Sequence, residues 1–164
     1  MSSGSGSASS CATLYDNDSK EMMGAKRTRS FSARFSTQVV EKLEAHSSRV
    51  GESKARVAER LIDEGLRIEE FPGIIFRPGP TGRRAGVAGG PDVWEIVRDL
   101  KGAAQEGVQD PIAAIASVTG LDRSKVELAA SYYAAYPEDI DKRIRMNDEA
   151  DERLRRALGI LPAA

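Results

Sequence analysis

The sequence predicts a mainly α-helical protein with one β-ribbon formed between two chains, followed by a β-hairpin and helical domain. Three observations predict this fold class. Apolar residues recur with period two over Lys26–Phe35, which is typical of a half-buried strand. Apolar residues of the following segments recur at intervals of three and four, which is typical of amphipathic helices. The chain has 164 residues, enough for one ordinary domain or two small ones.

Four segments follow from shifts in composition. Residues 1–25 are rich in Ser and Gly at their start, and we expect a disordered tail there. Residues 26–70 form a first domain, residues 71–137 a second, and residues 138–164 a charged C-terminal helix. The first domain ends where Phe71-Pro72-Gly73 interrupts the helical pattern.

The charge of the chain is balanced in total but uneven along it. Its 24 basic and 25 acidic residues leave a net charge of −1. Lys26–Arg56 holds eight basic and three acidic residues, a net charge of +5, whereas Val57–Glu70 holds two and five, a net charge of −3. An anionic partner would bind the basic segment.

Composition also excludes several classes of function. No apolar run approaches the roughly 18 residues that span a bilayer, so we expect a soluble, cytoplasmic protein with no membrane contact. The start of the chain has neither the basic nor the apolar region of a secretory signal. Cys11 and His46 are the only residues of their types, which excludes an internal disulfide, a cysteine-rich zinc site and a multi-histidine metal site. We expect no cofactor, no metal and no catalytic residues.

The basic segment predicts a strand followed by two helices. Phe31, Ala33 and Phe35 share one face of the strand, and Ser30, Ser32 and Arg34 share the other. Ser36 is a natural N-cap for a helix that ends at Gly51, and Ser53 is the N-cap of the next. The second helix carries a stripe that we expect to be buried, made of Val57, Ala58, Leu61, Ile62 and Leu66.

One strand and two helices cannot fold alone, because the strand leaves its backbone N–H and C=O groups unpaired and about forty residues bury little surface. Pairing with the same strand of a second chain solves both problems. We therefore expect a homodimer through residues 26–66 with a two-stranded antiparallel ribbon. Such a ribbon fits the major groove of DNA, where Arg and Ser side chains reach base edges.

The segment RSFSARFSTQVVEKLEAHSSRVGESKARVAERLIDEGL resembles the ribbon-helix-helix domain of MetJ/Arc/CopG-type repressors. The resemblance implies binding to operator DNA, with Ser30, Ser32 and Arg34 reading bases. It also places phosphate at the start of the second helix; the expected phosphate contacts are Arg27, Arg29, Ser53 and Lys54. A helix N-terminus suits phosphate because it offers free N–H groups and a positive dipole end. Ala33 departs from the larger aliphatic residue usual in this family.

The second domain predicts a hairpin and several helices. Ile74–Phe76 and Arg84–Val87 are short strands joined by a turn, and Pro91 opens a helix that places Trp94 in the core. Asp110-Pro111 and Asp122 start two further helices in a helix-turn-helix spacing. Contact of Arg123 and Lys125 with DNA stays an open alternative to packing or partner binding.

From Phe71 to about Asp141 the hairpin GPTGRRAG, the PDVWEIV helix and the segment ending at YYAAYPEDI resemble the helix-turn-helix-containing domain of antitoxins paired with PIN-like nuclease toxins. The resemblance implies neutralisation of a PIN-like toxin protein and repression of the shared operon. Arginines that could pair with the toxin's metal-binding carboxylates are Arg83, Arg84, Arg143, Arg145, Arg155 and Arg156.

Two alternatives remain at this point. One is a ribbon-helix-helix transcriptional regulator with no toxin partner. The other is a small enzyme that uses the glycine-rich hairpin with Asp92 and Glu95, although no P-loop and no GxGxxG fingerprint is present in the sequence.

Overall fold

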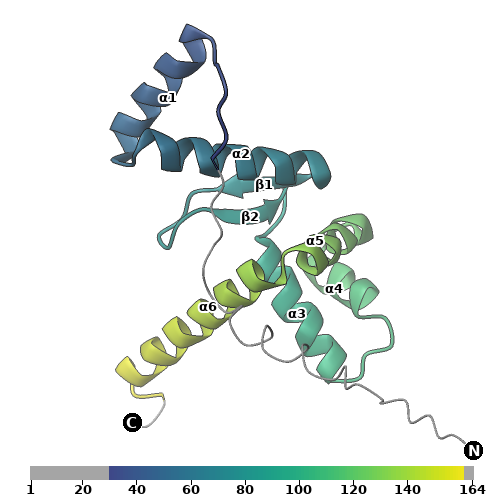
Figure 1. Ribbon diagram of the computed structural model, residues 1–164. Coiled ribbons are helices and arrows are strands. Elements are labelled where there is room, and N and C mark those ends of the chain that lie inside the picture. Colours follow the sequence, from purple (N-terminus) through teal and green to yellow (C-terminus); the bar gives the residue numbers. More distant parts are fainter. Residues whose placement is uncertain (1–29, 161–164) are drawn as a thin grey trace, which may run out of the picture. The chain divides into compact units, whose positions relative to one another are not determined.

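The computed structural model describes residues 30–160, which form six helices and one small antiparallel sheet (Figure 1). The protein is therefore mainly helical, as expected. The helices are α1 (Thr37–Val50), α2 (Lys54–Glu70), α3 (Val93–Gln105), α4 (Pro111–Thr119), α5 (Arg123–Ala135) and α6 (Pro137–Ala157), and the strands are β1 (Ile74–Arg77) and β2 (Arg84–Val87).

The described residues divide into two units, residues 30–40 and residues 41–160, with the boundary inside α1. The larger unit includes α2, which the sequence pattern assigns to the N-terminal domain. The difference follows from packing, because α2 contacts β1.

The predicted hairpin is confirmed. Strand β1 pairs antiparallel with β2, and the register places Ile74 opposite Val87 and Arg77 opposite Arg84. Alternate residues face alternate sides of a strand, so Ile74 and Val87 point into the core while the two arginines share the other face.

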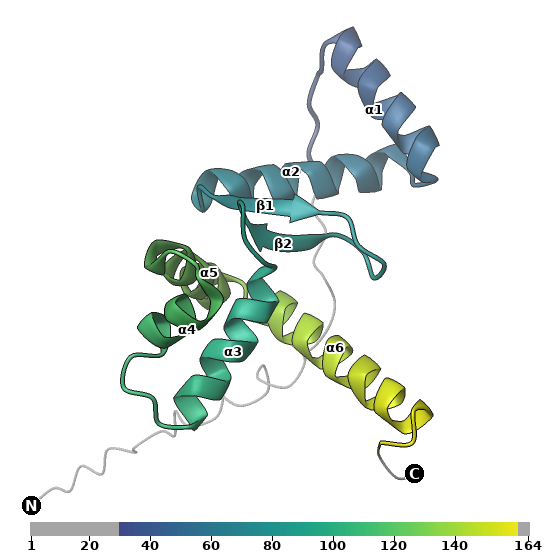
Figure 2. The same ribbon diagram turned by 180° about the vertical axis from the view of Figure 1, so that it is seen from behind.

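The core of the larger unit lies around α3, which contacts β2, α4, α5 and α6. Figure 2 shows these helices gathered on one side of the hairpin. The buried side chains come from all of these elements and from β1; they are Ile74, Ala85, Val87, Val93, Ile96, Val97, Ile115, Val126, Ala129, Tyr132 and Ile140. Trp94 is partly buried and packs against this cluster, in agreement with its predicted core role.

Capping residues and glycines in the sequence predicted most of the helix ends. The Ser53 side chain accepts a hydrogen bond from the Arg56 N–H, and the Asp110 side chain accepts one from the Ala113 N–H, so these two of the expected caps are formed. Asp122 is the N-cap of α5 but makes no side-chain cap hydrogen bond. Gly51 has the positive φ of 68° that a helix C-terminus favours. The prediction that Pro91 opens α3 was wrong by two residues, because Asp92 is the N-cap and its N–H donates to Glu95 at 2.8 Å.

The expected strand is not formed over its described part, residues 30–35. Ser30–Ser36 adopt no regular secondary structure, and residues 26–29 lie outside the described residues. The physical reason is the one that predicted a dimer: a strand exists through hydrogen bonds to a neighbour, and one copy supplies no neighbouring strand.

Candidate functional site

The residues expected to read bases are all solvent-exposed. Ser30, Ser32 and Arg34 lie in the irregular segment before α1. Arg27 and Arg29, two of the expected phosphate contacts, lie outside the described residues. These three residues are therefore accessible to a partner.

The other two phosphate candidates flank the start of α2. The Ser53 Oγ already accepts the Arg56 N–H at 3.3 Å, so this hydroxyl holds the helix end. The Lys54 Nζ lies 2.8 Å from Glu44 Oε1, in a pair whose side chains are both about half exposed. Exposed ion pairs of this kind contribute little, so Lys54 can exchange Glu44 for a phosphate at small cost.

The apolar stripe of α2 departs from its expected burial. Val57 is fully buried, but Leu61, Ile62 and Leu66 are 46%, 51% and 65% exposed. In the smaller unit, Phe31 is 86% exposed and Phe35 is 57% exposed. These side chains carry the periodic pattern of a core, and within their own units they are exposed.

A cluster of arginines lies on the hairpin. Arg77 Nη2 lies 2.9 Å from Asp92 Oδ1 and donates to the Gly90 carbonyl, while Arg84 Nε lies 2.6 Å from Asp92 Oδ2. The Asp92 side chain is buried, and it also accepts the Trp94 Nε1–H at 3.3 Å. Asp92 therefore fastens the outer face of the hairpin to the start of α3.

Two further arginines join the cluster at the turn between the strands. Arg83 Nε donates to Glu64 of α2 at 2.6 Å, and its Nη2 donates to the Phe76 carbonyl. Arg143 of α6 donates to the Thr81 hydroxyl and to the carbonyls of Thr81 and Arg83. Figure 2 shows α6 passing below this turn. We call Arg77, Arg83, Arg84 and Arg143 the hairpin arginine cluster.

The structure thus separates the six arginines proposed for partner binding into two groups. Arg83, Arg84 and Arg143 belong to the hairpin arginine cluster. Arg145, Arg155 and Arg156 are exposed on α6, where Arg156 pairs with Glu152 at 3.2 Å. Ile140 and Ile144 hold the first half of α6 to the core, whereas Leu154 and Leu158 in the second half are exposed.

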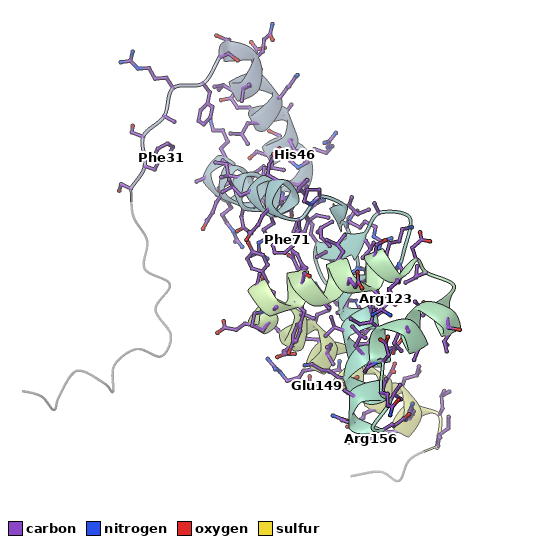
Figure 3. The ribbon with its side chains drawn as sticks, turned by 90° about the vertical axis from the view of Figure 1, so that its right-hand side faces the viewer. Phe31, His46, Phe71, Arg123, Glu149 and Arg156 are labelled. Carbon is purple, nitrogen blue, oxygen red and sulfur yellow. The ribbon has the colours of Figure 1, made fainter. Side chains whose placement is uncertain are left out.

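Arg67 joins α2 to the C-terminal helices, a role that no sequence pattern predicts. Its Nη1 donates to Asp139 at 2.7 Å and to the Tyr132 hydroxyl at 3.1 Å, and its guanidinium lies over the Tyr136 ring. Burial raises the pKa of Tyr132, and the hydrogen bond from Arg67 opposes that rise. Figure 3 shows Phe71 at the end of α2, where its ring packs edge-on against Tyr132.

The two helices of the expected helix-turn-helix, α4 and α5, are present, and Arg123 at the start of α5 has partners within the chain. Arg123 donates to Asp110 at 2.8 Å and to Glu127 at 2.9 Å. Lys125 is half-buried. Because two carboxylates neutralise Arg123, this pair offers a weaker DNA-binding surface than the segment from residue 30 to Arg56.

Comparisons with protein-family models, with curated proteins and with solved structures gave no match. Within residues 30–160, no group of three or more His, Cys, Asp or Glu side chains is placed to hold a metal ion. No helix in the same part of the chain has the length and apolar character needed to cross a membrane.

Proposed function

We propose that the protein is a dimeric, sequence-specific DNA-binding repressor of the ribbon-helix-helix type. The observation that carries the proposal is the exposed stripe Leu61, Ile62 and Leu66 on α2. A well-formed amphipathic helix with an uncovered apolar face needs a partner surface, and the predicted homodimer through residues 26–66 supplies one. Pairing of the same chains would also give Ser30–Phe35 the neighbouring strand that it lacks.

The chemistry of the segment suits DNA. In a paired ribbon, Ser30, Ser32 and Arg34 of both chains would share one face, with Arg34 positioned for a bidentate contact to guanine. The N-terminus of α2, with Ser53 and Lys54, would hold a backbone phosphate. The net charge of +5 over Lys26–Arg56 supplies long-range attraction to the duplex.

The proposal extends to the antitoxin of a type II toxin-antitoxin pair, which represses its own operon and neutralises a PIN-like nuclease toxin. It draws on the resemblance of residues 71–141 and on two arginine-bearing surfaces, the hairpin arginine cluster and α6. A transcriptional regulator with no toxin partner is the second candidate, and it is favoured by the internal partners of Arg83 and Arg143. Co-purification with the product of a neighbouring gene would decide between them.

The enzyme alternative has little support from geometry. Asp92 bonds two arginines and an indole N–H, and Glu95 accepts the Asp92 N–H. Both carboxylates therefore stabilise the start of α3 through contacts within the chain. Saturable turnover that is lost when Asp92 and Glu95 are replaced would be needed to revive this alternative.

Replacement of Arg34 tests the DNA interface. We expect Arg34→Ala to remove preference for the operator over random duplex, a loss of about 1–3 kcal/mol for each lost bidentate contact, while the dimer stays folded. Anisotropy titrations at several salt concentrations measure both affinities. Arg153→Ala, an exposed arginine on α6, is the matched control. Unchanged operator preference in Arg34→Ala would reject the ribbon as the reading surface.

A further inference from the structure

The hairpin arginine cluster carries more positive charge than its surroundings neutralise. Its four guanidinium groups meet two carboxylates, those of Glu64 and Asp92. Within the described residues Arg143 has only neutral oxygen atoms as partners, from Thr81 and Arg83. The cluster therefore holds a net charge of +2 in a chain whose total is −1.

Several guanidinium donors of the cluster remain available. Arg84 Nη1 and Nη2 and Arg77 Nη1 have no hydrogen-bond partner among residues 30–160. The side chains of Arg84 and Arg77 are 29% and 36% exposed, so a ligand can reach them. Asp92 forms ion pairs with Arg77 and Arg84 and accepts the Trp94 indole N–H. The negative charge that would balance the remaining guanidinium charge must therefore come from another group.

The register of the hairpin keeps the cluster in place. Arg77 and Arg84 are directly opposite in the two strands, where like charges repel. Gly79 and Gly86 make room for the side chains, because a Cβ on either residue would lie within 3 Å of a guanidinium group. The two forks are therefore held side by side by the backbone before any ligand arrives, which lowers the entropy cost of binding.

We propose that the hairpin arginine cluster binds a carboxylate-bearing segment of a protein partner. Guanidinium forks bind carboxylates through two parallel hydrogen bonds. A protein segment fits better than DNA, because α2 packs against β1 and Val57–Glu70 has a net charge of −3. The acidic residues of α2 would repel a continuous phosphate backbone that runs beside this helix. A short acidic segment can contact the arginines without extending along α2.

The proposal rests on the proposed function for the existence of a protein partner, and it is independent of DNA binding by residues 30–54. The test uses the full chain and a short synthetic peptide in which aspartates alternate with glycines. Its matched control is the same peptide with asparagines. Heteronuclear spectra that resolve the arginine Nε–H groups show which arginines respond.

We expect the aspartate peptide to shift the Nε–H signals of Arg77, Arg84 and Arg143 and to leave those of Arg153 and Arg155 in place. Arg143→Gln should weaken peptide binding about two- to fivefold, the range of a partly exposed ion pair, and Arg153→Gln should not change it. Arg77→Lys keeps the charge but loses the fork, so it should also weaken binding. This second variant tests the proposal if Arg143→Gln fails to fold.

Three results would overturn the proposal: shifts confined to the arginines of α6, equal binding of the asparagine peptide, or shifts of the cluster by random duplex DNA at lower concentration than by the peptide. The last result would identify the cluster as a nucleic-acid surface. Failure of the proposed DNA-binding function would appear in a separate measurement, as an operator preference that Arg34→Ala leaves unchanged.

Discussion

At the scale of single residues, Asp92 shows how a carboxylate in a glycine-rich segment can be structural. It caps α3, lies against Arg77 and Arg84, and accepts the Trp94 indole N–H. Its side chain is 7% exposed, so its charge is compensated by these neighbours instead of by water. A buried charge without partners would be costly, which makes the arrangement interdependent.

Removing Asp92 should therefore destabilise the larger unit. We expect Asp92→Ala to lower the free energy of unfolding by about 2–3 kcal/mol, because it leaves two adjacent arginines without a carboxylate. Urea denaturation followed by circular dichroism measures the change. Asp99→Ala is the control, since Asp99 is exposed and pairs only with Arg98 among the described residues. A loss below about 0.5 kcal/mol for Asp92→Ala would contradict the structural role.

Sequence reasoning found the residue-scale features that depend on near neighbours. Ser53 and Asp110 cap helices through contacts three residues away, and Gly51 ends α1 through its own backbone angle. Arg67 and Asp139 are 72 residues apart, so no local pattern links them. The ion pairs of Asp92 could not be predicted from sequence either, because they depend on the hairpin register that places Arg77 opposite Arg84.

At the scale of elements, the hairpin depends on glycines for a reason other than turn formation. Gly86 lies beneath the Arg77 guanidinium, and a Cβ there would come within 2.2 Å of Arg77 Nη2. A Cβ on Gly102 within α3 would have no such neighbour within 4 Å, so an alanine fits there. The two glycines have opposite consequences although both lie in regular elements.

We expect Gly86→Ala to destabilise the fold by about 0.5–1.5 kcal/mol, because the Arg77 guanidinium must move and lose its contacts with Asp92 and the Gly90 carbonyl. Gly102→Ala should instead stabilise it by about 0.5–1 kcal/mol, since alanine favours the helix more than glycine does. Thermal unfolding of both variants and of the parent chain shows whether each substitution lowers or raises the stability. Destabilisation by both substitutions would show that the space around Gly102 is needed.

The hairpin and most helices were predictable from sequence because each is specified by its own residues. The strand at Lys26–Phe35 has the right alternation, but alternation alone cannot form a strand without a neighbour. The stripe on α2 was correctly recognised as apolar, but its expected burial is met only at Val57, whereas Leu61, Ile62 and Leu66 are exposed. Both differences concern elements that the proposed dimer would complete.

At the scale of the whole molecule, these two differences have one explanation. Each unit has exposed apolar side chains, such as Phe31 in residues 30–40 and Ile62 on α2. A two-fold dimer would cover such surfaces with copies of themselves, since an isologous interface uses the same patch on both chains. Dimer formation and the fold of the basic segment should then be inseparable.

Ile62 provides the test of this explanation. It is 51% exposed in the single chain, so glutamate at this position would be harmless to a monomer. In the proposed dimer each substitution occurs twice and buries an unpaired charge. We expect Ile62→Glu to raise the dimer dissociation constant about a hundredfold or more, and operator binding should fall with it. Sedimentation equilibrium over a range of concentrations measures the constant.

Val118 on α4 is the matched control, because it is 84% exposed and lies outside residues 26–66. Val118→Glu should remain dimeric and bind operator as the parent chain does. A parent chain that is monomeric at all concentrations, or an Ile62→Glu variant that still dimerises, would reject the interface. If the parent chain is monomeric, the expected ribbon would have no second strand; if Ile62→Glu still dimerises, the chains associate through a surface other than this face of α2.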